Sequence, residues 1–198
     1  MRLTIFALLL PGLVLAQQKA AAPTFNKTFG ASSAPITVEV FSDFQCPACK
    51  SLHDGVLNQL TIDYVRTGKV RLIYRDFPLP MHPYARLAAQ YAVAASRINK
   101  YEAVADAIWK AQGNWSQNGA VESAVASALS PADMQKVKGF MKEPSTEAAI
   151  EADVALGKEN RIQQTPTMVI TKGIRRFPVA GNVNYGVLKR FIDDLLTK

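Results

Sequence analysis

The sequence predicts an α/β fold in which an all-helical insertion interrupts the sheet. Three observations lead to this prediction. Residues 36–75 follow the order strand, helix, strand, which is the crossover unit of a parallel sheet. Residues 84–161 show no convincing strand and carry Ala-rich helical patterns instead. Strand character returns over 167–179, where it is followed by a final helix.

The N-terminus has the pattern of a signal peptide. Arg2 precedes an apolar run over residues 3–15, which is too short for the roughly 20 residues that span a bilayer. Small residues then lead up to Ala16, after which we expect cleavage. An uncleaved N-terminal anchor is the alternative. Residues 1–16 are therefore assigned to a signal peptide, and 17–35, rich in Ala, Ser, Thr and Pro, to an irregular N-terminal segment.

The first strand and helix surround the only two cysteines. Ile36 to Phe41 is a β-branched and aromatic run that predicts a strand, and 70–75 predicts a second one. Between them, Pro47 is suited to the first turn of a helix, where its missing N–H costs nothing. The following apolar residues recur at steps of four and predict one buried helical face: Leu52, Val56, Leu60 and Tyr64.

The middle of the chain reads as helices throughout. We predict five of them, separated by breaks at Gly113-Asn114, Ser130-Pro131 and Glu143-Pro144. Their predicted ranges are 84–98, 101–112, 119–129, 131–142 and 145–161. This block is assigned to a helical insertion at residues 82–163.

The last part of the chain returns to the sheet. Residues 167–171 and 175–179 predict a hairpin, in which Pro178 favours an edge position. Residues 185–196 predict a closing helix. Residues 36–81 and 164–198 are therefore assigned to one sheet-containing domain.

Composition excludes several classes of protein. The 198 residues are 48% hydrophobic and 20% charged, as expected of a folded chain with a proper core. The net charge of +7 comes from Lys and Arg spread along the chain, apart from a small cluster at 172–176, so we expect a solvated basic surface and no nucleic-acid partner. A disulfide between the two cysteines would close too short a loop to add much stability, so we expect the pair to have a chemical role.

Cys46 and Cys49 form a CPAC motif between a strand and a helix. A helix N-terminus stabilises an anion through its free N–H groups and its dipole. This lowers the pKa of Cys46 and populates the thiolate that attacks disulfides. Cys49, one turn into the helix, is then placed to resolve the mixed disulfide. The motif predicts Cys46 as the nucleophile and Cys49 as the resolving thiol.

Here the chain resembles the thioredoxin-like superfamily, and specifically its DsbA-like thiol:disulfide oxidoreductases. The resemblance rests on three stretches: Phe41-Ser42-Asp43-Phe44-Gln45-Cys46-Pro47-Ala48-Cys49, Tyr74-Arg75-Asp76-Phe77-Pro78-Leu79-Pro80-Met81-His82-Pro83 and Gln164-Thr165-Pro166-Thr167. It implies a thioredoxin-like fold over residues 36–196, with the helical insertion included. It also implies a cis proline at Pro166 beside the redox pair, and a Thr165 that offers backbone groups to an extended substrate. Phe44, Pro47 and Ala48 support the motif.

One position departs from the family pattern. Related proteins often carry a buried acid six residues before the nucleophile, where this chain has Val40. Glu39 is one residue away, which on a strand places it on the opposite face. Asp43 is a candidate substitute for a proton relay, although a polar loop residue is the simpler interpretation.

Other chemistries remain as alternatives. Cys46, Cys49 and His53 suggest a copper carrier, but three ligands along one helix are poor geometry for a closed tetrahedral metal site. We interpret His53 as a helix-surface residue and His82 as a loop residue at the start of the insertion, and we assign no metal ligands. A non-catalytic binding module that kept the fold is a further alternative.

Together these features predict an exported oxidase that introduces disulfides into protein substrates. The redox-active disulfide Cys46–Cys49 is then its only redox group, with no separate cofactor, and a membrane redox partner reoxidises it. An isomerase or a reductase would use the same chemistry. About twenty residues precede the first strand after cleavage, too few for the dimerisation domain of dimeric isomerases, so we expect a monomer. The expected location is periplasmic or otherwise extracytoplasmic.

Overall fold

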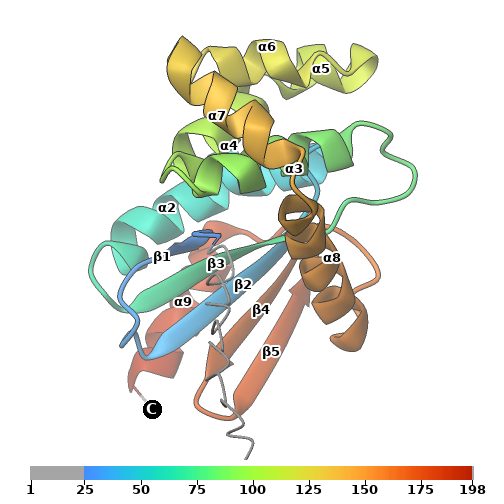
Figure 1. The fold of residues 1–198 in the computed structure, drawn as a ribbon. Coiled ribbons are helices and arrows are strands. Elements are labelled where there is room, and N and C mark those ends of the chain that lie inside the picture. Colours follow the sequence, from blue (N-terminus) through green and yellow to red (C-terminus); the bar gives the residue numbers. More distant parts are fainter. Residues whose placement is uncertain (1–24, 198) are drawn as a thin grey trace, which may run out of the picture.

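A computed structural model describes residues 25–197, so the predicted signal peptide and its cleavage after Ala16 lie outside the described residues. Within this range a five-stranded sheet runs in the order β1-β3-β2-β4-β5 (Figure 1). The strands are β1 (Thr28–Phe29), β2 (Ile36–Ser42), β3 (Val70–Asp76), β4 (Thr167–Lys172) and β5 (Arg175–Ala180). None of the helices in the described part of the chain combines the length and apolarity needed to cross a membrane.

The pairing of the strands confirms the predicted sheet. β2 and β3 are parallel, with Val40 beside Tyr74, while β4 runs antiparallel to β2 and forms a hairpin with β5. Pro178 lies on β5 at the edge of the sheet, as predicted. One part of the irregular segment 17–35 departs from expectation, because Thr28 and Phe29 pair with β3 as a two-residue strand. So short a strand is held by its hydrogen bonds to β3.

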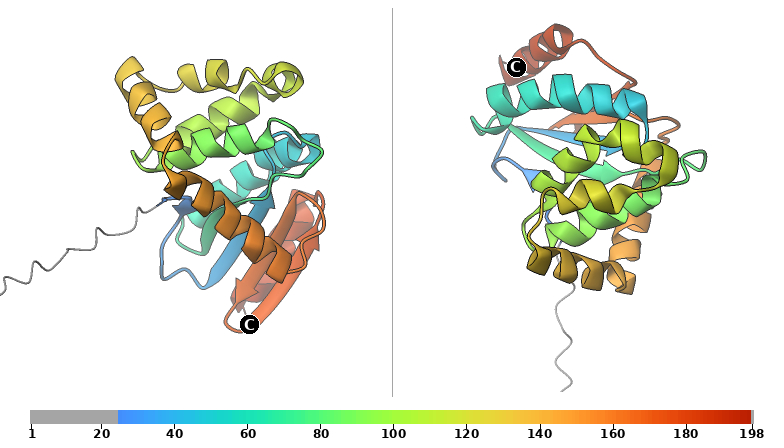
Figure 2. Two further views of the ribbon diagram at one scale, coloured as in Figure 1. Left: turned by 45° about the vertical axis from the view of Figure 1, so that its right-hand side comes forward. Right: turned by 90° about the horizontal axis from the view of Figure 1, so that it is seen from above.

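One face of the sheet is covered by the helix that follows the cysteines and by the C-terminal helix (Figure 2). The first consists of α1 (Pro47–Ser51), η1 (Leu52–Leu57), α2 (Asn58–Leu60) and η2 (Thr61–Val65), of which η1 and η2 are wound as π-helix. The second is α9 (Tyr185–Thr197). The four apolar residues predicted to form one helical face are all buried against this side of the sheet.

Six helices lie between β3 and β4 and agree with the predicted all-helical block. They are α3 (Ala85–Ser96), α4 (Tyr101–Lys110), α5 (Gln112–Asn118), α6 (Val121–Ala126), α7 (Pro131–Met141) and α8 (Pro144–Glu159). The predicted break at Gly113-Asn114 is wrong, because these residues lie inside α5. The chain instead turns after α5 at Gly119, which has a positive φ of 76°.

Helix α8 packs on the other face of the sheet. Gly157 lies so close to the Phe77 ring that a Cβ at this position would come within 2.5 Å of it. Phe41, on the same face, packs edge-on against Phe77 with ring centroids 6.3 Å apart. The small residue therefore sets how near α8 approaches the sheet.

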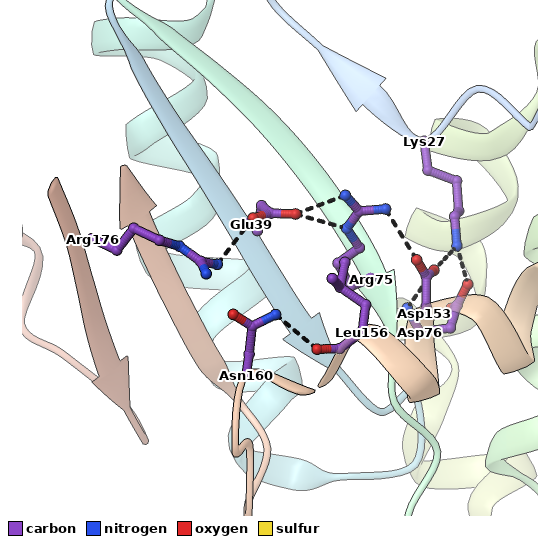
Figure 3. A network of polar contacts seen from close by, with 8 residues as sticks. All are labelled: Lys27, Glu39, Arg75, Asp76, Asp153, Leu156, Asn160 and Arg176. Atoms are coloured by element: carbon purple, nitrogen blue, oxygen red, sulfur yellow. Dashed lines mark hydrogen bonds and ion pairs between the residues drawn. The ribbon is translucent and has the colours of Figure 1, made fainter. Parts of the chain in front are cut away.

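Buried charges join the same helix to the strands and to the N-terminal segment (Figure 3). Lys27 forms ion pairs with Asp76 of β3 and Asp153 of α8, and all three side chains are almost fully buried. Arg75 reaches Asp153 at 3.1 Å and Glu39 at 2.7 Å. Burial lowers the pKa of Lys27, but the two carboxylates outweigh it and the net shift is upward. The N-terminal segment, the sheet and α8 are thus joined by one network in which the buried charges are paired.

Candidate active site

The two cysteines occupy the start of α1, at the junction of the sheet and the helical insertion. Cys46 is the residue that begins the helix, with extended backbone angles (φ −74°, ψ 120°), and Pro47 holds the first helical position. Cys49 lies in the first turn and is 1% exposed, whereas Cys46 is 7% exposed. Both are free thiols packed against the core of the insertion. The expected strand–turn–helix context of the motif is therefore present.

The two thiols differ strongly in acidity. The Cys49 thiol, which hydrogen-bonds to Cys46, is the largest cause that lowers the pKa of Cys46, to about 5. The backbone N–H groups of Ala48 and Cys49 at the helix start act in the same direction, while burial opposes them. Burial raises the pKa of Cys49, and so does its hydrogen bond to Cys46. One sulfur is thus ready to attack while the other keeps its proton.

The loop before β4, which is distant from the cysteines in the sequence, lies against Cys46. The Thr165–Pro166 peptide bond is cis, as the resemblance implied. The Thr165 carbonyl oxygen lies 3.6 Å from Cys46 Sγ, across 119 residues of chain. Thr165 is nearly buried, and its hydroxyl has no hydrogen-bond partner among the described residues. A backbone group of this loop therefore faces the nucleophilic sulfur.

The remaining motif residues have packing roles. The Phe44 ring stacks on Trp109 of the insertion with centroids 4.6 Å apart, and Phe44 is buried. Ala48 is half-buried against the same core, and Pro47 is exposed. Val40 is fully buried in the apolar face below α1, so the position of the family's buried acid carries no charge.

Two glutamines that the sequence did not single out hold the active-site loop. Gln112 of α5 donates from Nε2 to the carbonyl oxygens of Phe44, at 2.7 Å, and Cys46, at 3.1 Å. Gln45 donates to the Ser116 carbonyl and accepts from the Tyr84 backbone N–H. Gln45 belongs to the first of the three stretches that carry the family resemblance, but no local pattern indicates these contacts, since the partners lie 39 to 71 residues away. Only the fold brings them together.

Asp43 is a polar loop residue, as the simpler interpretation has it, but it is a buried one. It is 1% exposed, and its carboxylate accepts from the backbone N–H groups of Gln45 and Leu79, each at 2.7 Å. The same carboxylate lies 2.8 Å from His82 Nδ1. Its own backbone N–H donates to Cys49 Sγ at 3.5 Å. Both His82, a loop residue before α3 as predicted, and Asp43 are thus tied to the redox centre.

His53 also departs from its predicted place on the helix surface. It is 8% exposed, with its ring edge-on to Trp109 and Nε2 3.1 Å from an Asp106 carboxylate oxygen. Burial lowers the pKa of His53 to about 4. Within residues 25–197 no three His, Cys, Asp or Glu side chains are grouped as metal ligands would be. The prediction of an exposed His53 is wrong because α4, which covers His53, lies far away in the sequence.

The sequence matches a known family and a known relative. A family model described as thioredoxin matches residues 25–194. The probable disulfide bond formation protein D of Bacillus cereus is 24% identical over 178 residues, which cover 87% of this chain and 80% of that protein.

Solved structures give the same result for the fold. The crystal structure of alpha-DsbA1 from Wolbachia pipientis has a TM-score of 0.74 at 21% identity, covering 88% of this chain and 93% of that one. A thioredoxin-like oxidoreductase from Silicibacter pomeroyi DSS-3 has a TM-score of 0.71 at 25% identity, covering 86% and 92%. The chain therefore belongs to the thioredoxin family, as a DsbA-like thiol–disulfide oxidoreductase.

Proposed function

We propose that the protein is an exported oxidase that introduces disulfides into protein substrates through Cys46 and Cys49. The observation that carries this proposal is the difference between the two sulfurs, with a low pKa at Cys46 and a raised pKa at Cys49. A stabilised Cys46 thiolate favours the reduced form of the enzyme, which makes its disulfide a stronger oxidant.

The reaction proceeds in two exchanges. A substrate thiolate attacks Cys46 Sγ of the enzyme disulfide, and the bonding electrons of the broken S–S bond leave on Cys49, which takes up a proton. A second substrate thiolate attacks the substrate sulfur of the mixed disulfide and releases the Cys46 thiolate. The substrate loses two electrons and gains a disulfide, and the enzyme ends as a dithiol. The low pKa of Cys46 makes it the better leaving group in the second exchange.

The Thr165–Pro166 loop is the proposed binding element for the substrate. Its carbonyl oxygen beside Cys46 Sγ is placed to accept a backbone N–H from an extended peptide. Such a contact recognises the backbone of an extended peptide and does not depend on the side chains of the substrate. It suits an enzyme that acts on many unfolded proteins.

Export, the monomeric state and a membrane partner that reoxidises the dithiol belong to the same proposal. Export is supported by the apolar N-terminal run and by the small residues that follow it up to Ala16. The relative from Bacillus cereus bears a name that refers to disulfide formation, which is consistent with the oxidising direction.

The test is the reduction potential of the mature protein in glutathione buffers. An oxidase gives a value of about −120 mV, whereas about −270 mV indicates a reductase and contradicts the proposed direction. An intermediate value of about −180 mV favours an isomerase.

Two variants check the chemistry itself. Cys49→Ala is expected to trap a mixed disulfide with a substrate protein that already carries a disulfide, because the Cys46 thiolate breaks that bond and no second enzyme thiol then releases the substrate. Cys46→Ser is expected to lose all exchange. Unchanged exchange in Cys46→Ser would rule out the mechanism. Stoichiometric copper retained by the purified protein, and lost with Cys46→Ser, would favour a carrier instead.

A further inference from the structure

The resolving cysteine is held by a cluster of contacts that begins in the loop before it. The Asp43 backbone N–H donates to Cys49 Sγ at 3.5 Å, so the position of this amide affects the sulfur directly. Asp43 is the first residue after β2 and lies beyond the last residue of the strand ladder, Ser42. Something else must therefore hold the amide in place.

The Asp43 side chain supplies that restraint. One carboxylate oxygen accepts the Gln45 backbone N–H at 2.7 Å and closes a tight local turn. The other oxygen accepts the Leu79 backbone N–H at 2.7 Å and lies 2.8 Å from His82 Nδ1. A buried carboxylate is expensive unless it is fully hydrogen-bonded, and here every contact comes from the loop that holds the cysteines or from the loop that begins the insertion.

His82 completes the cluster from outside. Its side chain is 20% exposed while that of Asp43 is fully buried, so His82 is the outer member of the pair. The two residues are 39 apart in the chain and join the end of β2 to the segment after β3. Removal of His82 leaves one carboxylate oxygen with only the Leu79 N–H, which frees the loop to move.

We infer that Asp43 and His82 act as a positioning clasp for the resolving thiol, holding the Asp43 amide against Cys49 Sγ. The clasp rests on the proposed exchange function and deepens it. Its role is confined to the reoxidation of the reduced enzyme, in which Cys49 attacks the mixed disulfide that Cys46 has formed with the oxidant. In that step Cys49 loses its proton, its sulfur bonds to Cys46 Sγ, and the bound thiol leaves with the bonding electrons and takes a proton.

The clasp matters because Cys49 is a poor nucleophile by itself. Burial raises the pKa of Cys49, whereas the Asp43 backbone N–H lowers it and stabilises the thiolate that must form. Within residues 25–197 no hydrogen bond joins Cys46 to the Asp43 side chain, although the Cys46 backbone N–H donates to the Asp43 carbonyl oxygen at 3.1 Å. The Cys46 sulfur has no contact with the clasp, so its first attack does not depend on it.

The experiment uses the reduced, mature protein with oxidised glutathione as the probe. Acid quenching and mass spectrometry follow first the Cys46–glutathione mixed disulfide and then its conversion to the enzyme disulfide. His82→Ala is expected to slow the second step about tenfold, the loss typical of one hydrogen bond to a charged group, and to change the first step by less than about twofold.

Three further variants give the controls. His82→Asn restores an N–H near the position of Nδ1, and is expected to return the second step to near the wild-type rate. Met81→Ala changes a 75% exposed neighbour in the same loop and leaves both steps unchanged. Asp43→Asn is expected to slow the second step as His82→Ala does, and the double variant to be no slower than the slower single one, because both act on one unit.

Each outcome decides between the alternatives. A wild-type second step in His82→Ala overturns the clasp, as does an equal slowing of both steps or an additive double variant. If the wild-type protein itself forms no mixed disulfide with glutathione, the proposed function fails and not the clasp alone.

Discussion

The low pKa of the Cys46 thiol is the property on which the chemistry of the protein depends. Its low pKa has two main sources, the Cys49 S–H and the backbone N–H groups of Ala48 and Cys49 at the helix start. Both lie within three residues of Cys46. The effect is therefore largely built into the CPAC motif and its position at the start of a helix.

The first prediction concerns this acidity. In the reduced protein the ultraviolet absorbance of the thiolate should titrate with a midpoint near pH 5. Below this pH the alkylation rate of Cys46 should fall by about tenfold per pH unit, because only the thiolate reacts. A midpoint near about 8.5, the value of an ordinary thiol, would contradict the assignment.

A matched pair of variants separates the causes. Cys49→Ala removes the hydrogen-bond donor that contributes most, so the Cys46 midpoint should move upward. Cys49→Ser keeps an O–H donor and should move it less. An unchanged midpoint in both variants would assign the low pKa to the helix start alone.

At the scale of elements, contacts decide what local patterns leave open. The helix after the cysteines was predicted from four apolar residues, and all of them are buried, yet two of its segments are wound as π-helix. A π-helical turn shifts later residues around the axis, and spacing alone does not reveal it. The position of helix α8 against the sheet likewise depends on a tertiary contact, the close approach of Gly157 to the Phe77 ring.

Gly157 makes the second prediction. Gly157→Ala places a methyl group about 2.5 Å from the Phe77 ring, which forces α8 away from the sheet. Overpacking of this kind costs about 1–3 kcal/mol in the free energy of unfolding, measured by urea denaturation. Gly139→Ala in α7 is the control, since nothing lies within 4 Å of its added Cβ, and it should stabilise by about 0.4–1 kcal/mol. Equal effects of the two substitutions would mean that α8 does not pack closely at Gly157.

At the scale of the whole molecule, the buried charges link parts that the sequence separates. Lys27 precedes β1, Asp76 ends β3 and Asp153 lies in α8, so one cation holds the N-terminal segment, the sheet and the insertion (Figure 3). Burial raises the pKa of Asp76 even beside Lys27. The network is balanced, and removal of one member leaves the others without compensation.

Lys27→Met is the third prediction. It leaves two buried carboxylates short of a cation and should lower the free energy of unfolding by about 3–5 kcal/mol. Lys138→Met breaks an exposed pair with Glu122 and should cost less than about 1 kcal/mol. The loss in Lys27→Met should shrink as the pH falls, because Asp76 already has a raised pKa and takes up a proton. A loss that is constant with pH would contradict this account.

The sequence by itself determined the features that depend on short range. The CPAC motif, the strand and helix around it, the helical block and the final hairpin all follow from residue types and their spacing. Hydrophobic periodicity and turn residues act over a few positions and can be read along the chain. The cis bond at Pro166 followed only from the family resemblance.

Tertiary structure alone decided which polar residues are buried and what they contact. Asp43, His53 and Lys27 look like surface residues in sequence, yet each is covered by segments that lie tens of residues away. Their burial is tolerated because distant groups such as His82, Asp106 and Asp153 pair with their polar atoms. Thr28 and Phe29 form a strand for the same reason, since their hydrogen bonds come from β3. Compensation between distant groups is a property of the folded chain, and no local pattern encodes it.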